Sequence, residues 1–196
     1  MKHKAIVIGS SAGGFHALKK IIPLLPEDFS LPIMIVQHIS ATSDNYMVKY
    51  LDKLSQLTVK EADEKEEVKS GYVYISPPNY HLLVEEDFTL SLSTDAKKNY
   101  SRPSIDILFE TACYAFGSEL IGIVLTGANS DGSEGLKMIR DSGGLCIVQD
   151  PKEAEANSMP FSAIKVAGPQ KVLKLKAIAN HLISIDKKIK KTKAKE

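Results

Sequence analysis

The stretch Lys4-Ala-Ile-Val-Ile-Gly-Ser-Ser-Ala-Gly-Gly14 begins with a short apolar run and ends in a glycine-rich turn. A short apolar run bounded by turn residues is typical of a strand that is buried on both faces, as in a parallel sheet. The segment from Phe15 to Ile22 then has apolar residues at helical spacing, and Pro23 ends the pattern. This succession of strand, glycine turn and helix predicts the first unit of an α/β sheet.

The same alternation continues along the chain. Apolar runs predict further strands, and helical spacing recurs between them; the strands are expected at 32–38, 120–125 and 145–149, and the helices at 43–57, 104–116, 131–140 and 171–185. In the middle, the short runs 72–76, 81–84 and 88–93 favour a small antiparallel hairpin at one edge of the sheet. We therefore predict a doubly wound, mostly parallel, Rossmann-like three-layer α/β fold.

Composition and length fit one soluble domain. The chain has 196 residues, of which 43% are hydrophobic and 25% charged. No run approaches the ~20 apolar residues that a membrane-spanning helix needs, and the apolar start is too short for a signal peptide. Cys113 and Cys146 match no metal-ligand spacing. We therefore expect a cytoplasmic protein without membrane insertion, metal or cofactor.

Charge is distributed unevenly between a predicted domain, residues 1–186, and a basic C-terminal tail, residues 187–196. The tail carries six lysines and one glutamate, so the rest of the chain is net negative although the whole is +1. A net negative body argues against a nucleic-acid-binding face. The tail is interpreted either as a solvated, frayed end or as an electrostatic docking arm.

Three polar residues follow predicted strands at the edge where α/β sheets form their sites. Ser11 is the centre of Gly-x-Ser-x-Gly, a turn that lifts a hydroxyl clear of the sheet at the start of a helix. His38 ends the second strand, where an imidazole can take the serine proton. Asp131 follows the most apolar strand, where a carboxylate can orient that imidazole. Taken singly, each residue also has a structural explanation: a tight turn, a strand-end histidine or a helix cap.

Several motifs occur in one order along the chain: Gly-Ser-Ser-Ala-Gly-Gly at 9–14, Val-Gln-His at 36–38, Arg-Pro-Ser-Ile-Asp at 102–106, Leu-Thr-Gly-Ala-Asn-Ser-Asp-Gly at 125–132, and Gly-Gly-Leu-Cys-Ile-Val-Gln-Asp at 143–150 before Met159-Pro160. Together they resemble the catalytic domain of chemotaxis protein-glutamate methylesterases of the CheB type. The resemblance covers about residues 4–185. Several ordered motifs are far more specific than one Gly-x-Ser-x-Gly.

The resemblance implies hydrolysis of glutamate methyl esters, and often glutamine deamidation, on the methylated helical cytoplasmic domains of chemoreceptors. It makes Ser11 the nucleophile, His38 the general base and Asp131 the orienting carboxylate. The backbone N–H groups near Ala12 and Ala128 are the expected oxyanion donors, although the family usually has threonine and methionine there. Arg102 is expected either to contact substrate carboxylates or to form a salt bridge at a helix start.

The sequence departs from the family because the first strand begins a few residues after Met1. Family members commonly carry an N-terminal receiver domain, and ~120 residues would be needed for one. We therefore expect a free-standing catalytic domain whose activity is constitutive or controlled by a regulator in trans. This departure also leaves open whether the pathway is chemotaxis or another signalling system.

Three other classes of protein share parts of this pattern. A dinucleotide-binding module lacks support because Gly-x-Gly-x-x-Gly is absent and the acid expected after the second strand is His38. An α/β-hydrolase would require its histidine after the acid, and only His181 follows Asp131. A catalytically silent signalling adaptor on the same fold is the main alternative, because sequence does not measure turnover.

Overall fold

The structure is a computed structural model that describes residues 3–194. Its strands are β1 (Ala5–Ser10), β2 (Ile33–Gln37), β3 (Thr58–Glu61), β4 (Tyr72–Ile75), β5 (His81–Val84), β6 (Leu90–Ser93), β7 (Leu120–Val124), β8 (Leu145–Gln149) and β9 (Lys171–Leu173). Its helices are α1 (Gly14–Ile21), α2 (Tyr46–Leu54), α3 (Ile105–Phe116), α4 (Ser133–Asp141), α5 (Ser158–Ala167) and α6 (Leu175–Lys193), with the short 3₁₀ turns η1 (Ile22–Leu24) and η2 (Gly117–Glu119).

Seven of the strands form one sheet in the order β3-β4-β2-β1-β7-β8-β9, and every neighbouring pair is parallel. The first strand, β1, lies in the middle of the sheet. Strands β2, β3 and β4 are added on one side of it, and β7, β8 and β9 on the other. The predicted doubly wound sheet is therefore confirmed. Connections leave β1 and β7 in opposite directions, and such a switch point is where α/β sheets form their sites, at the carboxyl ends of the strands.

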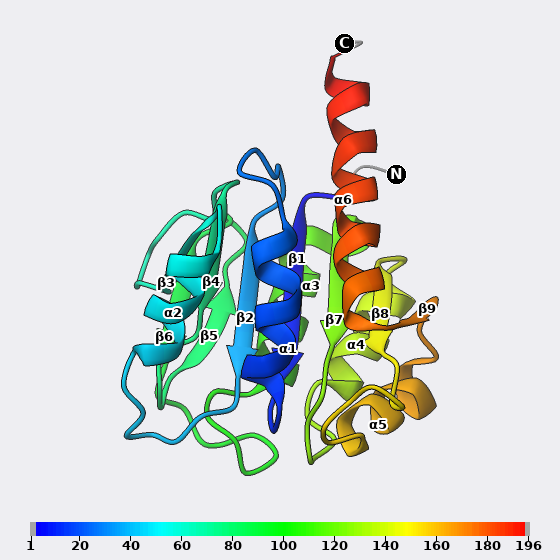
Figure 1. The fold of residues 1–196 in the computed structure, drawn as a ribbon. Helices are drawn as coiled ribbons and strands as arrows, with labels where there is room; N and C mark the ends of the chain where they lie inside the picture. The colour runs from blue at the N-terminus through cyan, green and yellow to red at the C-terminus, as the bar shows by residue number, and fades with distance from the viewer. Residues whose placement is uncertain (1–2, 195–196) are drawn as a thin grey trace.

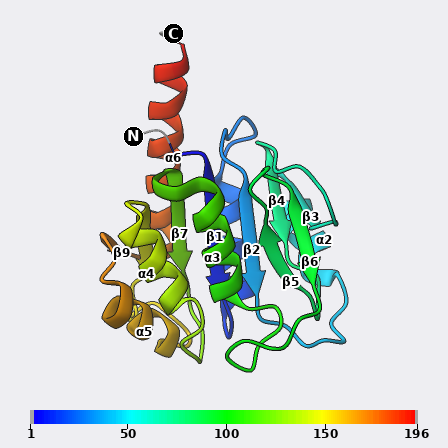
Figure 2. The same cartoon turned by 180° about the vertical axis from the view of Figure 1, so that it is seen from behind.

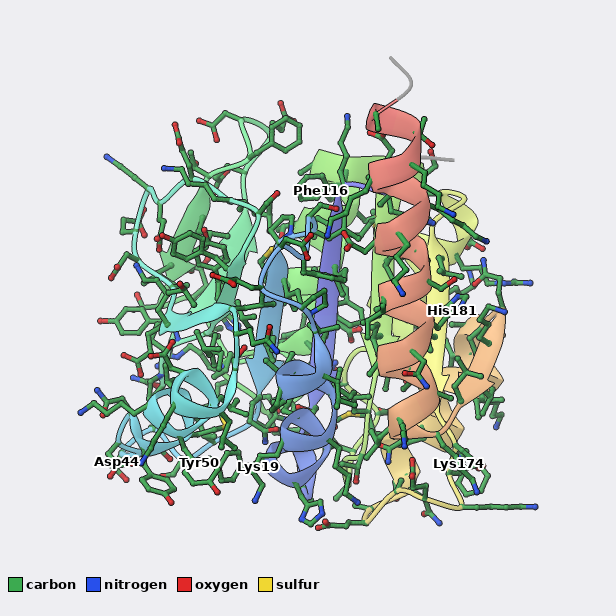
Figure 3. The ribbon with its side chains drawn as sticks, turned by 45° about the horizontal axis from the view of Figure 1, so that its top comes forward. Lys19, Asp44, Tyr50, Phe116, Lys174 and His181 are labelled. Carbon is green, nitrogen blue, oxygen red and sulfur yellow. The ribbon has the colours of Figure 1, made fainter. Side chains whose placement is uncertain are left out.

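Helices cover both faces of this sheet. Figure 1 shows α1, α2 and α6 in front, and Figure 2 shows α3, α4 and α5 on the reverse. Alternate residues of β1 point to the two faces, so Ile6 and Ile8 join one apolar cluster and Ala5 and Val7 the other. On the front face the ammonium of Lys19 lies over the ring of Tyr50, 5.5 Å from its centroid (Figure 3). None of the helices between residues 3 and 194 has the length and apolar character needed to cross a membrane.

The hairpin formed by β5 and β6 is antiparallel, as predicted, but it makes a separate two-stranded sheet. It packs on the α3 side, where Leu82, Val84 and Leu90 join the apolar cluster of that face. The predicted small antiparallel hairpin is therefore confirmed, and the structure adds that it does not pair with the large sheet. β4, which the sequence grouped with the hairpin, is a parallel strand between β2 and β3. The strands β3 and β9 and the helix α5 were not predicted.

The basic C-terminal residues continue α6 through Lys193, where a frayed tail was one expectation. Ile189 is only 6% exposed and belongs to the apolar cluster of the front face. The ammonium of Lys190 lies 2.8 Å from carboxylate oxygens of both Asp28 and Asp186. These contacts tie the helix to the domain beyond residue 186, so the predicted domain boundary there falls inside a helix.

We therefore expect Ile189→Ala to lower the free energy of unfolding by about 2 kcal/mol, because removing buried methyl groups loses apolar burial and leaves a cavity. Denaturant titration measures this. Lys191→Ala, two residues further along the same helix at an exposed position, is the matched control and should be neutral. Equal stability of both variants would show that residues 187–193 do not belong to the domain.

Candidate active site

Strand register brings Ser11 and His38 side by side at the carboxyl edge. Ser10 and Gln37 are paired in the parallel ladder, and the backbone N–H of His38 donates to the carbonyl of Ser10 at 2.9 Å. The residues that follow this pair are Ser11 and His38, on neighbouring strands whose backbones lie about 4.8 Å apart. On the other side, the N–H of Ser11 donates to the carbonyl of Thr126 at 2.9 Å, which joins the turn to the segment after β7.

A buried glutamine fixes this pair of turns. The Nε2 of Gln37 donates to the carbonyls of Ser11 at 2.8 Å and His38 at 2.9 Å, while its Oε1 accepts the hydroxyl of Ser10 at 2.7 Å. A Cβ on Gly14 would lie 1.9 Å from that Oε1, so this position of the turn admits only glycine. The side chain that ends β2 thus links the carbonyl of Ser11 to the carbonyl of His38 and also binds the Ser10 side chain at the end of β1.

His38 and Asp131 form a hydrogen-bonded pair. The Nε2 of His38 lies 2.8 Å from Oδ2 of Asp131, and the Asp131 side chain is fully buried. The other ring nitrogen, Nδ1, faces the side-chain amide of Asn129 at 3.4 Å. Nε2 therefore donates to the carboxylate and Nδ1 keeps the lone pair that accepts a proton. No hydrogen bond joins the hydroxyl of Ser11 to His38 among the described residues; such bonds are often long in unliganded enzymes and tighten with substrate.

The carboxylate of Asp131 also receives the N-terminus of α3. It accepts the backbone N–H of Ile105 at 2.8 Å and of Asp106 at 3.1 Å, and the hydroxyl of Ser104 at 3.0 Å. Burial by itself raises the pKa of Asp131, but the hydrogen bonds from His38 and Ile105 outweigh it and hold the pKa below its usual range. Asp131 is therefore a carboxylate at neutral pH.

Arg102 stabilises the loop that leads into α3. Its guanidinium donates to Oδ1 of Asn79 at 2.9 and 3.2 Å and to the carbonyls of Thr94 and Asp95. The expected alternative of a salt bridge at the helix start is wrong, since Arg102 pairs with no carboxylate among the residues described. Contact with substrate stays a prediction.

His81 also supports this loop, a role that no motif in the sequence indicates. Its ring is buried, with Nδ1 accepting the backbone N–H of Ser104 at 3.1 Å and Nε2 lying 3.2 Å from the carbonyl of Ala96. Burial lowers the pKa of His81, which keeps Nδ1 available as an acceptor. Asn99, Ser104 and Asp106 were likewise missed as partners of Asp131; the only signal was that the last two belong to the motif at 102–106.

The expected oxyanion donors lie on exposed turns beside Ser11. Within residues 3–194, the backbone N–H groups of Ala12 and Ala128 donate to no other group. The hydroxyl of Thr126 donates to the carbonyl of Ala12 at 2.8 Å and accepts the N–H of Ala156 at 2.9 Å, which holds the two turns together. Unused N–H groups on fixed turns suit a developing oxyanion, and this role for the two alanines stays a prediction.

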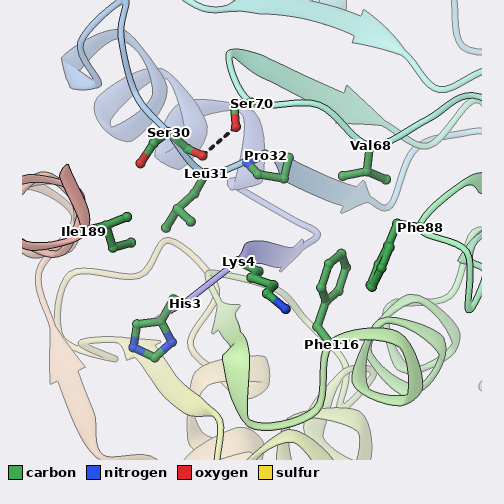
Figure 4. A pocket seen from close by; sticks show the side chains of 10 residues that line it. All are labelled: His3, Lys4, Ser30, Leu31, Pro32, Val68, Ser70, Phe88, Phe116 and Ile189. Atoms are coloured by element: carbon green, nitrogen blue, oxygen red, sulfur yellow. Dashed lines mark hydrogen bonds between the residues drawn. The ribbon is translucent and has the colours of Figure 1, made fainter. Parts of the chain in front are cut away.

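Two cavities adjoin the candidate site. One of about 260 Å³ is lined by His38 together with Lys97, Tyr100 and Arg102. Another of about 210 Å³ lies beyond Gln37 and is largely apolar. A larger cavity, about 410 Å³, lies at the opposite ends of the strands and is remote from this chemistry (Figure 4). No group of three or more His, Cys, Asp or Glu side chains between residues 3 and 194 is placed to hold a metal ion.

A serine at a tight strand-to-helix turn, beside a histidine paired with a buried carboxylate, has the arrangement of a serine hydrolase. Residues 6–182 match the family model for the CheB methylesterase, and the chain belongs to this family. Its members include methylesterases, and the chain is an enzyme of this hydrolase class.

Relatives of known name and structure support the assignment. A protein of Leptospira interrogans is 55% identical over 186 residues, which are 95% of this chain and 96% of that protein. A protein-glutamate methylesterase/protein-glutamine glutaminase of Archaeoglobus fulgidus is 34% identical over 93% of this chain but only 53% of its own length. The crystal structure of the Thermotoga maritima CheB methylesterase catalytic domain superimposes with a TM-score of 0.90 at 36% identity, covering 94% of this chain and all of that one.

We expect Asp131→Asn to lower kcat by roughly 10⁴-fold. The amide can donate to Nε2 of His38, which moves the ring proton to Nδ1 and removes the base, and it cannot stabilise the imidazolium. Steady-state ester hydrolysis measures the loss. Asp141→Asn, on the exposed surface of α4, is the control and should leave kcat unchanged. A near-normal rate for Asp131→Asn would show that Asp131 serves only as a helix cap and takes no part in catalysis.

Proposed function

We propose that the chain hydrolyses methyl esters of glutamate side chains in a signalling protein, with Ser11 as nucleophile, His38 as base and Asp131 as orienting carboxylate. The observation that carries this proposal is the His38–Asp131 hydrogen bond of 2.8 Å beside the serine turn. The family supplies the class of reaction. The same site is proposed to deamidate glutamine, because both reactions release a small group from a glutamyl acyl carbon.

In the first half-reaction, Oγ of Ser11 attacks the ester carbonyl while Nδ1 of His38 takes its proton. Asp131 stabilises the imidazolium that results, through the hydrogen bond to Nε2. The negative carbonyl oxygen of the tetrahedral intermediate is bound by the backbone N–H groups of Ala12 and Ala128. The intermediate collapses with cleavage of the bond to the methoxy oxygen, which takes the proton from His38 and leaves as methanol. The glutamyl group remains esterified to Ser11.

In the second half-reaction, water attacks the acyl-enzyme. Nδ1 of His38 takes a proton from this water and returns it to Oγ of Ser11 as the ester bond breaks. The products are the restored serine and the glutamate side chain, which releases the water's second proton to solvent and becomes a carboxylate. With a glutamine substrate the first leaving group is ammonia, and the second half-reaction is the same.

The proposed substrate is the methylated helical cytoplasmic domain of a chemoreceptor or related signalling protein. This follows from the family and not from a feature of the surface. The cavity of about 260 Å³ beside His38 is the proposed place for the glutamyl side chain, with Arg102 in its wall. A substrate of this kind requires a cytoplasmic location. We further propose that a regulator acting in trans, if one controls the enzyme, covers this edge of the sheet.

We expect Ser11→Ala and His38→Ala each to abolish methanol release from methylated receptor membranes, with losses on the order of 10⁶ in kcat. Ser118→Ala and His181→Ala replace the same residue types away from the site and serve as controls with normal rates. More than about a tenth of wild-type turnover in either site variant would disprove the assignment. No turnover by the wild type on any methylated or glutamine substrate would favour a silent adaptor.

A further inference from the structure

Asp106 is a second buried carboxyl beside the site, and the proposed mechanism does not use it. It lies in the first turn of α3 and is 2% exposed. Its Oδ1 accepts the backbone N–H of Gly135 at 2.8 Å, and its Oδ2 accepts the side-chain amide of Asn99 at 3.0 Å. A buried carboxyl with both oxygens engaged is costly to keep unless those contacts matter.

The contacts of Asp106 and Asp131 are reciprocal. Asp131 lies just before α4 and accepts two backbone N–H groups from the first turn of α3, one of them from Asp106 itself at 3.1 Å. Asp106 lies in α3 and accepts a backbone N–H from the first turn of α4. Asp131 therefore holds the helix that carries Asp106, and Asp106 holds the helix that follows Asp131. The amide of Asn99 spans the two carboxyls, 3.0 Å from Asp106 and 3.4 Å from Asp131.

The two helices must pack closely for these reciprocal hydrogen bonds to form. A Cβ on Gly135 would lie 2.6 Å from Cβ of Phe109, so α4 reaches Asp106 only because residue 135 is glycine. The positive N-terminal ends of both helices point at the carboxyl pair, which offsets the cost of burying two acids together.

The two acids differ in their tendency to hold a proton. Burial raises the pKa of Asp106, and the N–H of Gly135 only partly opposes this, whereas the pKa of Asp131 is lowered. When the pair holds one proton, that proton resides on Asp106, and Asp131 keeps the charge that faces His38.

We propose that Asp106 is a positioning residue of the active site, which fixes the first turn of α4 and thereby the carboxylate of Asp131 against His38. The proposal rests on the triad of the proposed function. In this proposal Asp106 acts by accepting the backbone N–H of Gly135, and not through its charge. An uncharged side chain of the same shape that accepts this hydrogen bond should therefore replace it.

The test compares Asp106→Ala with Asp106→Asn. We expect Asp106→Ala to lower kcat about 10- to 100-fold with KM within twofold, because a displacement of order 1 Å at a catalytic group has such an effect. Asp106→Asn keeps an oxygen for the Gly135 N–H and loses only the bond accepted from Asn99. Because the Gly135 bond is the one that fixes α4, kcat should recover to within about threefold of wild type. The downfield ¹H resonance of the His38 Nε2–H, assigned by ¹⁵N labelling, should be lost in Asp106→Ala and retained in Asp106→Asn.

Asp186→Ala is the matched control. Asp186 is also a buried carboxyl, 1% exposed, and it accepts the backbone N–H of Ser30 at 2.9 Å on the α6 side of the sheet. Its loss should destabilise the fold while leaving kcat and the His38 resonance unchanged. Such a result separates positioning from general stability.

Two results would overturn the proposal: a folded Asp106→Ala with wild-type kcat and an unchanged resonance, or an Asp106→Asn as impaired as the alanine variant. If Asp106→Ala does not fold, Asp106→Asn decides: retained rate and slow exchange of the Gly135 amide support the accepted hydrogen bond, and loss of either contradicts it. If the wild type itself releases no methanol, the proposed function fails, and the His38 resonance in the same variants still tests the position of Asp131.

Discussion

The carboxylate of Asp131 is completely buried, and the organisation of the carboxyl edge depends on how its charge is stabilised. An isolated ionised carboxylate in a protein interior is very costly, so every such group needs donors. The first turn of α3 supplies backbone N–H groups from Ile105 and Asp106, and Ser104 adds its hydroxyl. The partial positive charge of that helix end acts in the same direction. Oδ2, which accepts the N–H of Ile105, also accepts from Nε2 of His38 and so orients the imidazole.

Bringing α3 to Asp131 imposes packing constraints on the strands. The side chain of Ile105 occupies the space beside Gly9 and Gly132: an added Cβ would lie 2.2 Å from its Cγ2 at residue 9 and 2.5 Å from it at residue 132. Gly9 is the first glycine of the serine turn, and Gly132, with φ of +89°, caps α4. These glycines are therefore needed for the close approach of the helix that stabilises Asp131, as well as for the turns themselves.

The parts of the fold that could be predicted are those where the sequence signal is local. Buried strands such as Ala5–Ser10 are continuous apolar runs, and their order with helices fixes the parallel topology. Short β3 and β9 have no such run and form only because neighbouring strands pair with them. The hairpin itself could be predicted, but not that β5 and β6 form a sheet of their own, because a strand pattern does not specify which surface the strands cover.

The same distinction holds for the candidate site. Ser11, His38 and Asp131 could be proposed because each follows a strand, and parallel strands end at one edge. The residues that hold them could not, because Gln37, His81 and Asp106 act through contacts between segments distant in sequence. A buried polar side chain inside an otherwise apolar element is the nearest signal, but it does not reveal its partner.

The ionisation of Asp131 affects both the stability of the fold and the proposed chemistry. Its pKa is lower in the folded chain than in the unfolded one, so its charge stabilises the fold above the unfolded pKa, and this contribution is lost as pH falls through the folded pKa. The same carboxylate holds His38 with Nε2 protonated, which leaves Nδ1 as the base. Protonating Asp131 therefore weakens the attachment of α3 and the orientation of the base together. Placing the charge at a helix N-terminus keeps that pKa low, so the requirement for a folded edge and the requirement for a correctly oriented histidine are met by one set of hydrogen bonds.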